Sequence, residues 1–136
     1  MGKKRISVQS AKAKGRRAQQ WIMRKISKLT GIPCGKDELI ASREMGQSGT
    51  DVRLIGEAQK KFPFSVEAKY QETWSVPSWI RQAKENQKEG TDWLLLAKKN
   101  QHEYIIILDA EVFFKLLTPT PQLTRKKPNL ILRRRK

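Results

Sequence analysis

Three charged residues of complementary types lie in two neighbouring segments of the sequence. Glu67 and Lys69 flank Ala68 in the alternating segment 64–70, and Asp51 opens the alternating segment before it. Side chains two residues apart in a strand share a face, so Glu67 and Lys69 are expected to stand side by side. Two carboxylates, with the Ala68 carbonyl as a further oxygen ligand, suit Mg²⁺, for which Mn²⁺ is a possible substitute. Lys69 would orient or deprotonate a water and offset transition-state charge, as hydrolysis of a phosphodiester requires.

The Glu-x-Lys pattern also has an ordinary interpretation. It arises by chance in a chain this charged, and Glu–Lys pairs are common on the solvated face of a sheet. The functional interpretation is favoured because the alternation is strict and because a Gly/Ser loop at 45–50 precedes Asp51.

The charge of the chain is concentrated at its two ends. Its 136 residues include 29 Lys and Arg against 13 Asp and Glu, for a formal net charge of +16. Residues 1–30 contain ten basic residues and residues 118–136 contain seven, with no acid in either segment. A nearly neutral body with basic ends predicts a polyanion partner, with nucleic acid as the first candidate. A membrane surface, a ribosomal partner or merely solvated tails are the alternatives.

Several classes of function are excluded by what the sequence contains. A single Cys34 excludes a disulfide framework or a cysteine zinc site, and a single His102 excludes HNH-type nuclease chemistry and Ser-His-Asp triads. The longest apolar runs are five residues each, so no membrane span is expected. No apolar segment follows the basic N-terminus, so we expect no signal peptide. We expect a cytoplasmic, DNA-associated protein, in the host cytoplasm if phage-encoded, without a small-molecule cofactor.

Periodicity predicts a single α/β domain with the order α-β-β-β-α-β-β-α, a mixed sheet flanked by helices. A basic disordered arm is expected at 1–10, the domain at 11–117 and a basic, Pro-containing tail at 118–136. The predicted helices are 11–29, a second that Ser75 and Pro77 open and Gly90 stops, and 110–117. The predicted strands are 38–43, 51–55, 64–70, and the buried runs 93–97 and 104–108. Antiparallel pairing of 51–55 with 64–70 across the connection 56–63 would bring Asp51 near Glu67.

The first predicted helix has an apolar stripe and a basic back that would lie against DNA or simply face water. The stripe contains Ala18, Ile22, Ile26 and Leu29, with Trp21 beside them. Two further candidates have ordinary alternatives: Ser48 would contact a phosphate or make the turn, and Trp74 would stack on a base or pack in the core. The candidate DNA-binding residues are Lys12, Lys14, Arg16, Arg17, Arg24, Arg43, Ser48 and Trp74.

The layout Gly15…Asp51…Glu67-Ala68-Lys69 resembles the PD-(D/E)XK nuclease superfamily. Within it, the chain is most similar to small archaeal-type Holliday-junction resolvases and their phage-encoded relatives, over roughly residues 11–117. The resemblance implies a restriction-endonuclease-like fold and a Mg²⁺-dependent endonuclease. It also implies a homodimer that recognises branched DNA by shape. Carried over, Asp51 and Glu67 would bind metal and Lys69 would be catalytic.

The chain departs from the family pattern at two positions. Thr50 replaces the Pro before the Asp, and Gln19 replaces a helix Glu. Gln19 would ligate through its oxygen or bind a water, but it brings no charge. Glu38 or Glu44 would supply a third acid, or each lies in a surface pair. Gln82 matches a Gln that follows Glu-x-Lys in some branches, or it is a solvated helix residue.

Two alternatives to a resolvase stay open. A nicking or repair endonuclease of the same fold would act on duplex or flap DNA. A catalytically silent DNA-binding protein would have lost its site, with Gln19 as the mark of that loss.

Overall fold

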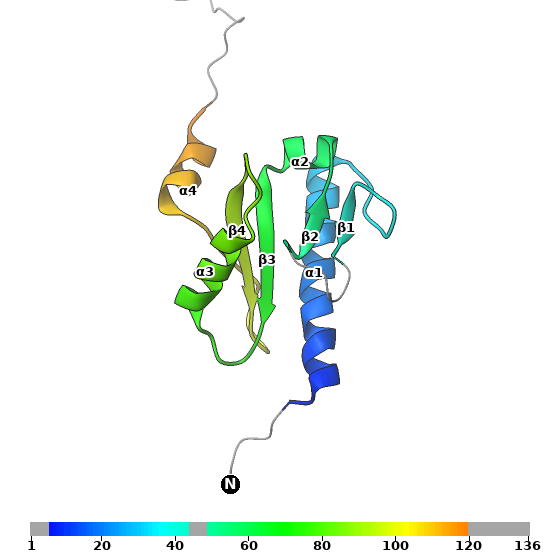
Figure 1. Cartoon of the computed structure of the whole chain (residues 1–136), viewed down its shortest axis with the longest axis vertical. Coiled ribbons are helices and arrows are strands. Elements are labelled where there is room, and N and C mark those ends of the chain that lie inside the picture. The colour runs from blue at the N-terminus through cyan, green and yellow to red at the C-terminus, as the bar shows by residue number, and fades with distance from the viewer. Residues whose placement is uncertain (1–5, 44–48, 120–136) are drawn as a thin grey trace, which may run out of the picture.

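The structure, a computed structural model, describes residues 6–43 and 49–119 of the chain. These residues form one α/β domain (Figure 1). The elements are α1 (Val8–Thr30), β1 (Ile40–Ser42), β2 (Val52–Leu54), α2 (Glu57–Lys61), β3 (Phe64–Tyr70), α3 (Val76–Glu85), β4 (Asp92–Lys98), β5 (Ile105–Ile107) and α4 (Ala110–Leu117). This order adds α2 to the predicted one, within the segment expected to be a plain connection.

The long helix α1 runs from an N-cap to a glycine stop. The Ser7 hydroxyl accepts a hydrogen bond from the Ser10 N–H, so the helix begins at Val8, within the segment we had assigned to the arm. Gly31 ends it in the left-handed region at φ 76°. Leu29, expected on the apolar stripe, is instead 72% exposed, in the last turn of the helix. The buried positions are Ala18, Ile22, Met23 and Ile26.

The strands form two small sheets rather than one continuous sheet. β1 and β2 pair antiparallel, while β3 pairs in parallel with β4, and β4 pairs antiparallel with β5. The predicted antiparallel ladder between β2 and β3 does not form within the described residues. A backbone hydrogen bond from the Asp51 N–H to the Val66 carbonyl, 2.9 Å long, links the two segments instead. The strands diverge because α2 fills the connection between them, so Asp51 lies where the two sheets separate.

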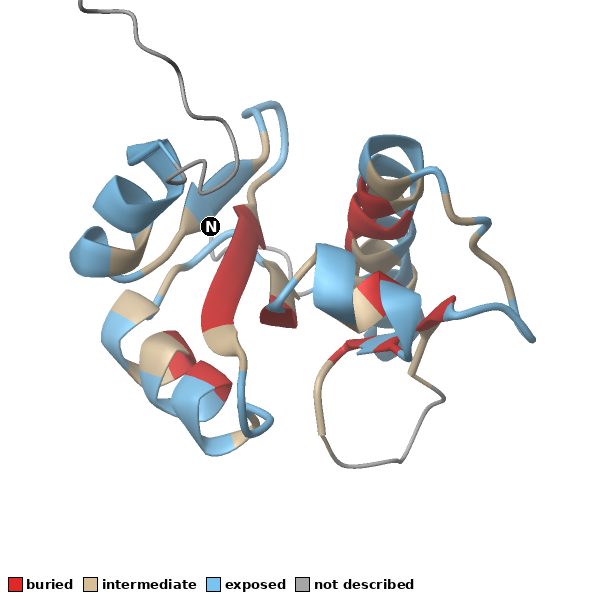
Figure 2. Ribbon diagram, turned by 90° about the horizontal axis from the view of Figure 1, so that it is seen from above, coloured by how far each residue is buried: buried red, intermediate tan, exposed pale blue. Residues whose placement is uncertain are grey.

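Helices cover both faces of the β3–β4 pair. On one face, Val66 and Leu96 pack against α1 in the larger core cluster. On the other, Leu95 packs against α3 through Trp79 and Ala83. Figure 2 shows buried residues concentrated in the strands between these helices. The polar face of β3 therefore lies under α3 rather than in water.

The C-terminal elements are more exposed than expected. The segment 104–108 was predicted to be a buried strand, but β5 spans Ile105–Ile107, and Ile105 and Ile106 are exposed because β5 lies at the edge of its sheet. None of the residues of α4, all of which are described, is buried (Figure 2). The helix α3 ends at Glu85 with Asn86 as its C-cap, earlier than the predicted stop at Gly90. Gly90 instead adopts φ 82° just before β4.

Candidate active site

Asp51 is buried where β2 and β3 separate, with 5% of its surface exposed. Its Oδ1 accepts a hydrogen bond of 2.6 Å from Arg43 Nη2, and its Oδ2 accepts one of 2.8 Å from the Ala68 N–H. Arg43 directly follows β1, and its N–H bonds to the Asp51 carbonyl. Asp51 is therefore held by Arg43 after β1 and by Ala68 of β3. Ala68 is the residue between Glu67 and Lys69.

Glu67 and Lys69 point to the same face of β3, as their spacing predicts. The Lys69 ammonium lies 3.8 Å from Glu67 Oε2, and Glu67 is only 3% exposed. Two side chains of the α3 segment contact this pair. Lys69 Nζ donates to Gln82 Oε1 at 2.8 Å, and Asn86 Nδ2 donates to Glu67 Oε1 at 3.3 Å. This burial contradicts the interpretation of the Glu-x-Lys pair as a solvated ion pair.

The structure thus brings four of the predicted catalytic positions into one neighbourhood, and adds one that the sequence analysis missed. Gln82 is exposed on α3, and its side-chain oxygen accepts a hydrogen bond from Lys69. Asn86, which contacts Glu67, was not predicted. The spacing of Asn86 could have indicated its position: it follows Gln82 by four residues, so the two side chains lie on the same side of the α3 segment.

Burial shifts the titration of both acids. Desolvation raises the pKa of Asp51, although the Ala68 N–H and the Arg43 charge oppose the shift. Desolvation is also the main cause of the raised pKa of Glu67, and the negative charge of Asp51 adds to it. The positive charges of Arg43 and Lys69 offset part of this cost, and a further cation bound by the carboxylates would favour their ionised forms.

The donor set fits a hard divalent cation. Carboxylate oxygens are the ligands that Mg²⁺ prefers, and Glu67 would bind it together with Asp51, with the Ala68 carbonyl as a further candidate. Within the described ranges no cluster of three or more Asp, Glu, His or Cys side chains forms, so the described site offers two acids. Glu38 is exposed beyond the opposite end of β1 from Arg43, and Glu44 lies outside the described residues.

The raised pKa values predict how stability responds to pH and Mg²⁺. Because folding raises these pKa values, the unfolded state releases protons that the folded state still holds. The free energy of unfolding should fall as the pH rises from the ordinary carboxyl range through the raised values. At pH 8, Mg²⁺ at about ten times its Kd should raise the Tm of the wild type by about 5 °C.

Differential scanning fluorimetry with ionic strength matched by NaCl measures both effects. Glu67→Gln should show a flatter decline of Tm with pH and little response to Mg²⁺. Equal Mg²⁺ responses in the wild type and the variant would contradict a cation site at Glu67.

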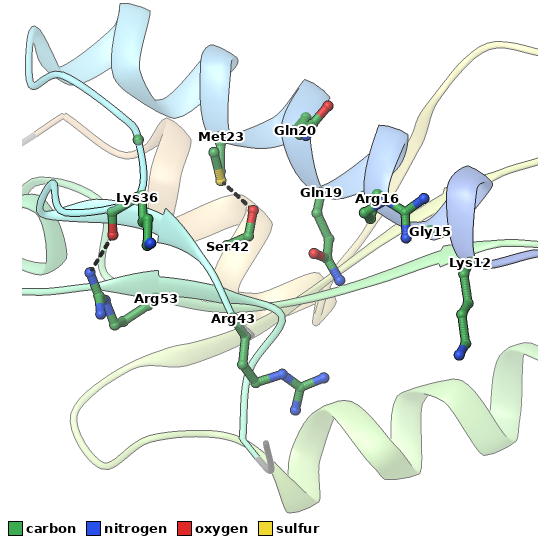
Figure 3. Close-up of a pocket in the computed structure, with 11 residues that line it drawn as sticks. Lys12, Gly15, Arg16, Gln19, Gln20, Met23, Lys36, Ser42, Arg43 and Arg53 are labelled. Carbon is green, nitrogen blue, oxygen red and sulfur yellow. Dashed lines mark hydrogen bonds between the residues drawn. The ribbon is translucent and has the colours of Figure 1, made fainter. Parts of the chain in front are cut away.

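A basic pocket opens next to the acidic site. Its volume is about 670 Å³, and helix α1, strand β1 and the segments beside it line it (Figure 3). Gln19 projects into this pocket from α1, and no described hydrogen bond joins it to Asp51 or Glu67. Arg43 connects the two regions, because it lines the pocket and also binds Asp51. The basic lining residues are Lys12, Arg16, Lys36, Arg43 and Arg53.

The other predicted DNA-binding residues lie elsewhere. Lys14 and Arg17 lie over the Tyr70 ring, outside the pocket, and Arg24 is exposed on α1. Trp74 packs against Trp79 with ring centroids 5.8 Å apart, as its core interpretation predicts. It also lines a second cavity of about 440 Å³. Ser48 lies outside the described residues.

Comparison with known protein families, characterised proteins and solved structures finds no match to this chain. Among the described helices, none is long and apolar enough to cross a membrane.

Proposed function

We propose that this protein is a Mg²⁺-dependent endonuclease that hydrolyses phosphodiesters in branched DNA. One observation carries the proposal: two buried, mutually repelling carboxylates lie beside a lysine, and Arg43 links one of them to a pocket lined by cations. The acids would bind a metal ion, the lysine would contact the reacting phosphate, and the pocket would bind the DNA backbone beside it.

Each side chain has a defined part in the proposed reaction. When bound by Asp51 and Glu67, Mg²⁺ would supply Lewis acidity toward the scissile phosphate. Gln82 holds the Lys69 ammonium, which orients the attacking water and offsets negative charge in the transition state. Asn86 fixes one oxygen of Glu67. Arg43 and Arg16, which both line the pocket, would hold phosphates of the DNA backbone there.

The proposed substrate preference is tested with a labelled four-way junction and a linear duplex of matched sequence. In Mg²⁺ we expect paired nicks in the junction, little cleavage of the duplex and no cleavage in EDTA. Equal cleavage of both substrates would support the nicking or repair endonuclease instead. Tight binding without cleavage in Mg²⁺ or Mn²⁺ would support the catalytically silent DNA-binding protein.

The proposed enzyme is a homodimer, because a four-way junction presents two symmetric cleavage sites. A second copy of the chain is the partner that best suits the exposed surface of β5 and α4. This surface carries large apolar side chains, and residues 105–117 include two acids and only one lysine. Two chains that each carry +16 approach most easily at such a face, while a polyanion would avoid it. The exposed apolar residues are Ile105, Ile106, Phe113, Phe114, Leu116 and Leu117.

The double substitution Phe114→Asp and Leu117→Asp is expected to convert the dimer into a folded monomer, because neither residue is buried within the chain. Light scattering coupled to size exclusion measures the mass of each species. Leu29→Asp is the control: it introduces a single aspartate at an exposed leucine on α1, away from this surface, and should stay dimeric. A monomeric wild type, or a dimeric double variant, would contradict this interface.

A further inference from the structure

The two flanks of α1 carry two separate sets of cations. Lys12 and Arg16 face the pocket on the β1 side. Lys14 and Arg17 face the ring of Tyr70, on β3, instead. With 3.6 residues per turn, the two sets of cations project in nearly opposite directions from the helix axis. The buried stripe of α1 lies between them.

Three cations converge on the ring of Tyr70. The Lys14 and Lys98 ammonium groups lie 5.4 Å from the ring centroid, and the Arg17 guanidinium carbon lies 5.8 Å from it. Lys98 is held in place, because its ammonium donates to the backbone carbonyls of Lys99 and His102. Each cation is attracted to the ring face, yet the three positive charges repel one another.

The aromatic surface continues along α1 beyond Tyr70. Trp21 stacks on Tyr104 with ring centroids 4.0 Å apart and an interplanar angle of 13°. Lys25 lies 5.3 Å from the Trp21 ring centroid, and Lys98 lies 5.4 Å from that of Tyr104. We call the surface of Lys14, Arg17, Trp21, Lys25, Tyr70, Lys98 and Tyr104 the Tyr70 surface.

The charge on the Tyr70 surface is largely uncompensated. Glu72 is the one acid that forms an ion pair with these cations among the described residues, at 3.7 Å from the Lys14 ammonium. The other three cations, Arg17, Lys25 and Lys98, lie over aromatic rings, and none of them forms an ion pair with a described carboxylate. Phosphate oxygens brought against Arg17 and Lys98 would relieve the repulsion and release counterions from the bound DNA.

We propose that the Tyr70 surface binds the phosphate backbone of a second DNA arm, distinct from the arm that enters the basic pocket. This inference rests on the proposed function and adds to it a physical basis for the preference for branched DNA. A branched molecule engages both flanks of α1 at once, whereas a linear duplex engages one. The contacts are to the backbone, so they carry no base specificity.

The test measures DNA binding in EDTA, where no cleavage occurs. The variant Lys14→Gln/Arg17→Gln removes two cations from the Tyr70 surface and keeps a polar side chain with the first two methylene groups at each position. Lys60→Gln/Lys61→Gln on α2 is the control, since it removes the same charge from the other end of the domain. Thermal denaturation of both variants verifies that they fold.

For the junction, the slope of log Kd against log salt should decrease by about 2 in the Lys14/Arg17 variant, since each lost phosphate contact removes about one counterion. Its junction affinity should fall about tenfold, while its affinity for linear duplex and both affinities of the control stay near wild type. An unchanged junction slope, or equal losses on junction and duplex, would overturn the second-arm surface while leaving the nuclease proposal intact. A wild type that binds neither DNA would overturn both proposals.

Discussion

Replacing Lys69 by Met is expected to lower the single-turnover rate of DNA cleavage by about a thousandfold, with DNA binding nearly unchanged. The substitution keeps the aliphatic stem but removes the ammonium that lies between Glu67 and Gln82. Loss of a preorganised group that stabilises transition-state charge lowers rates by about 10² to 10³-fold. We expect binding to be retained, because the pocket cations make the proposed contacts with the DNA backbone.

Lys84→Met is the matched control for this experiment. Lys84 is exposed on α3, near the site in sequence but without a described contact to its acids. We expect the Lys84→Met variant to cleave DNA at close to the wild-type rate. Cleavage by Lys69→Met within a few-fold of wild type would exclude the proposed role of the lysine, whatever its effect on binding.

Replacing Arg43 by Ala is expected to lower the free energy of unfolding by about 3 kcal/mol. The side chain of Asp51 is 7% exposed and that of Arg43 is 24% exposed, so their ion pair is largely shielded from water. Without Arg43, the Asp51 carboxylate keeps the Ala68 N–H but loses its direct cationic partner. The cost arises mainly from leaving this charge buried and unpaired.

Urea denaturation at neutral pH measures the effect. Arg53→Ala is the control, because Arg53 lines the same pocket but is exposed and donates only to backbone carbonyls. The loss in Arg43→Ala should shrink at acidic pH, where Asp51 becomes protonated. It should also shrink in an Asp51→Asn background. Equal stability of the Arg43 and Arg53 variants would show that the Arg43–Asp51 pair contributes little.

Local patterns were sufficient to predict β3 and the side chains that it contributes to the candidate site. Alternation placed β3 at 64–70 and oriented Glu67 and Lys69 to one face, because the two-residue period of a strand is a local property. Ala110–Leu117 likewise forms the predicted last helix, with Asp109 as its N-cap.

Long-range packing decided what the local patterns could not predict. Alternation in β2 and β3 does not reveal that the strands diverge, because their pairing depends on the insertion of α2. The burial of Glu67 depends on where α3 docks, and Asn86 becomes part of the site for the same reason. The apolar run of β5 predicted a buried strand, but no described element covers its exposed side chains.

The most direct test of the central claim compares cleavage by the wild type and by Glu67→Gln in Mg²⁺ and in EDTA. Gln is nearly isosteric with Glu, so the variant should fold, bind the junction and keep its contact with Asn86. The account predicts cleavage by the wild type in Mg²⁺ alone, and a rate for Glu67→Gln lower by about 10³-fold. Cleavage by Glu67→Gln at the wild-type rate, or cleavage by the wild type in EDTA, would contradict a metal-dependent nuclease built on Asp51, Glu67 and Lys69.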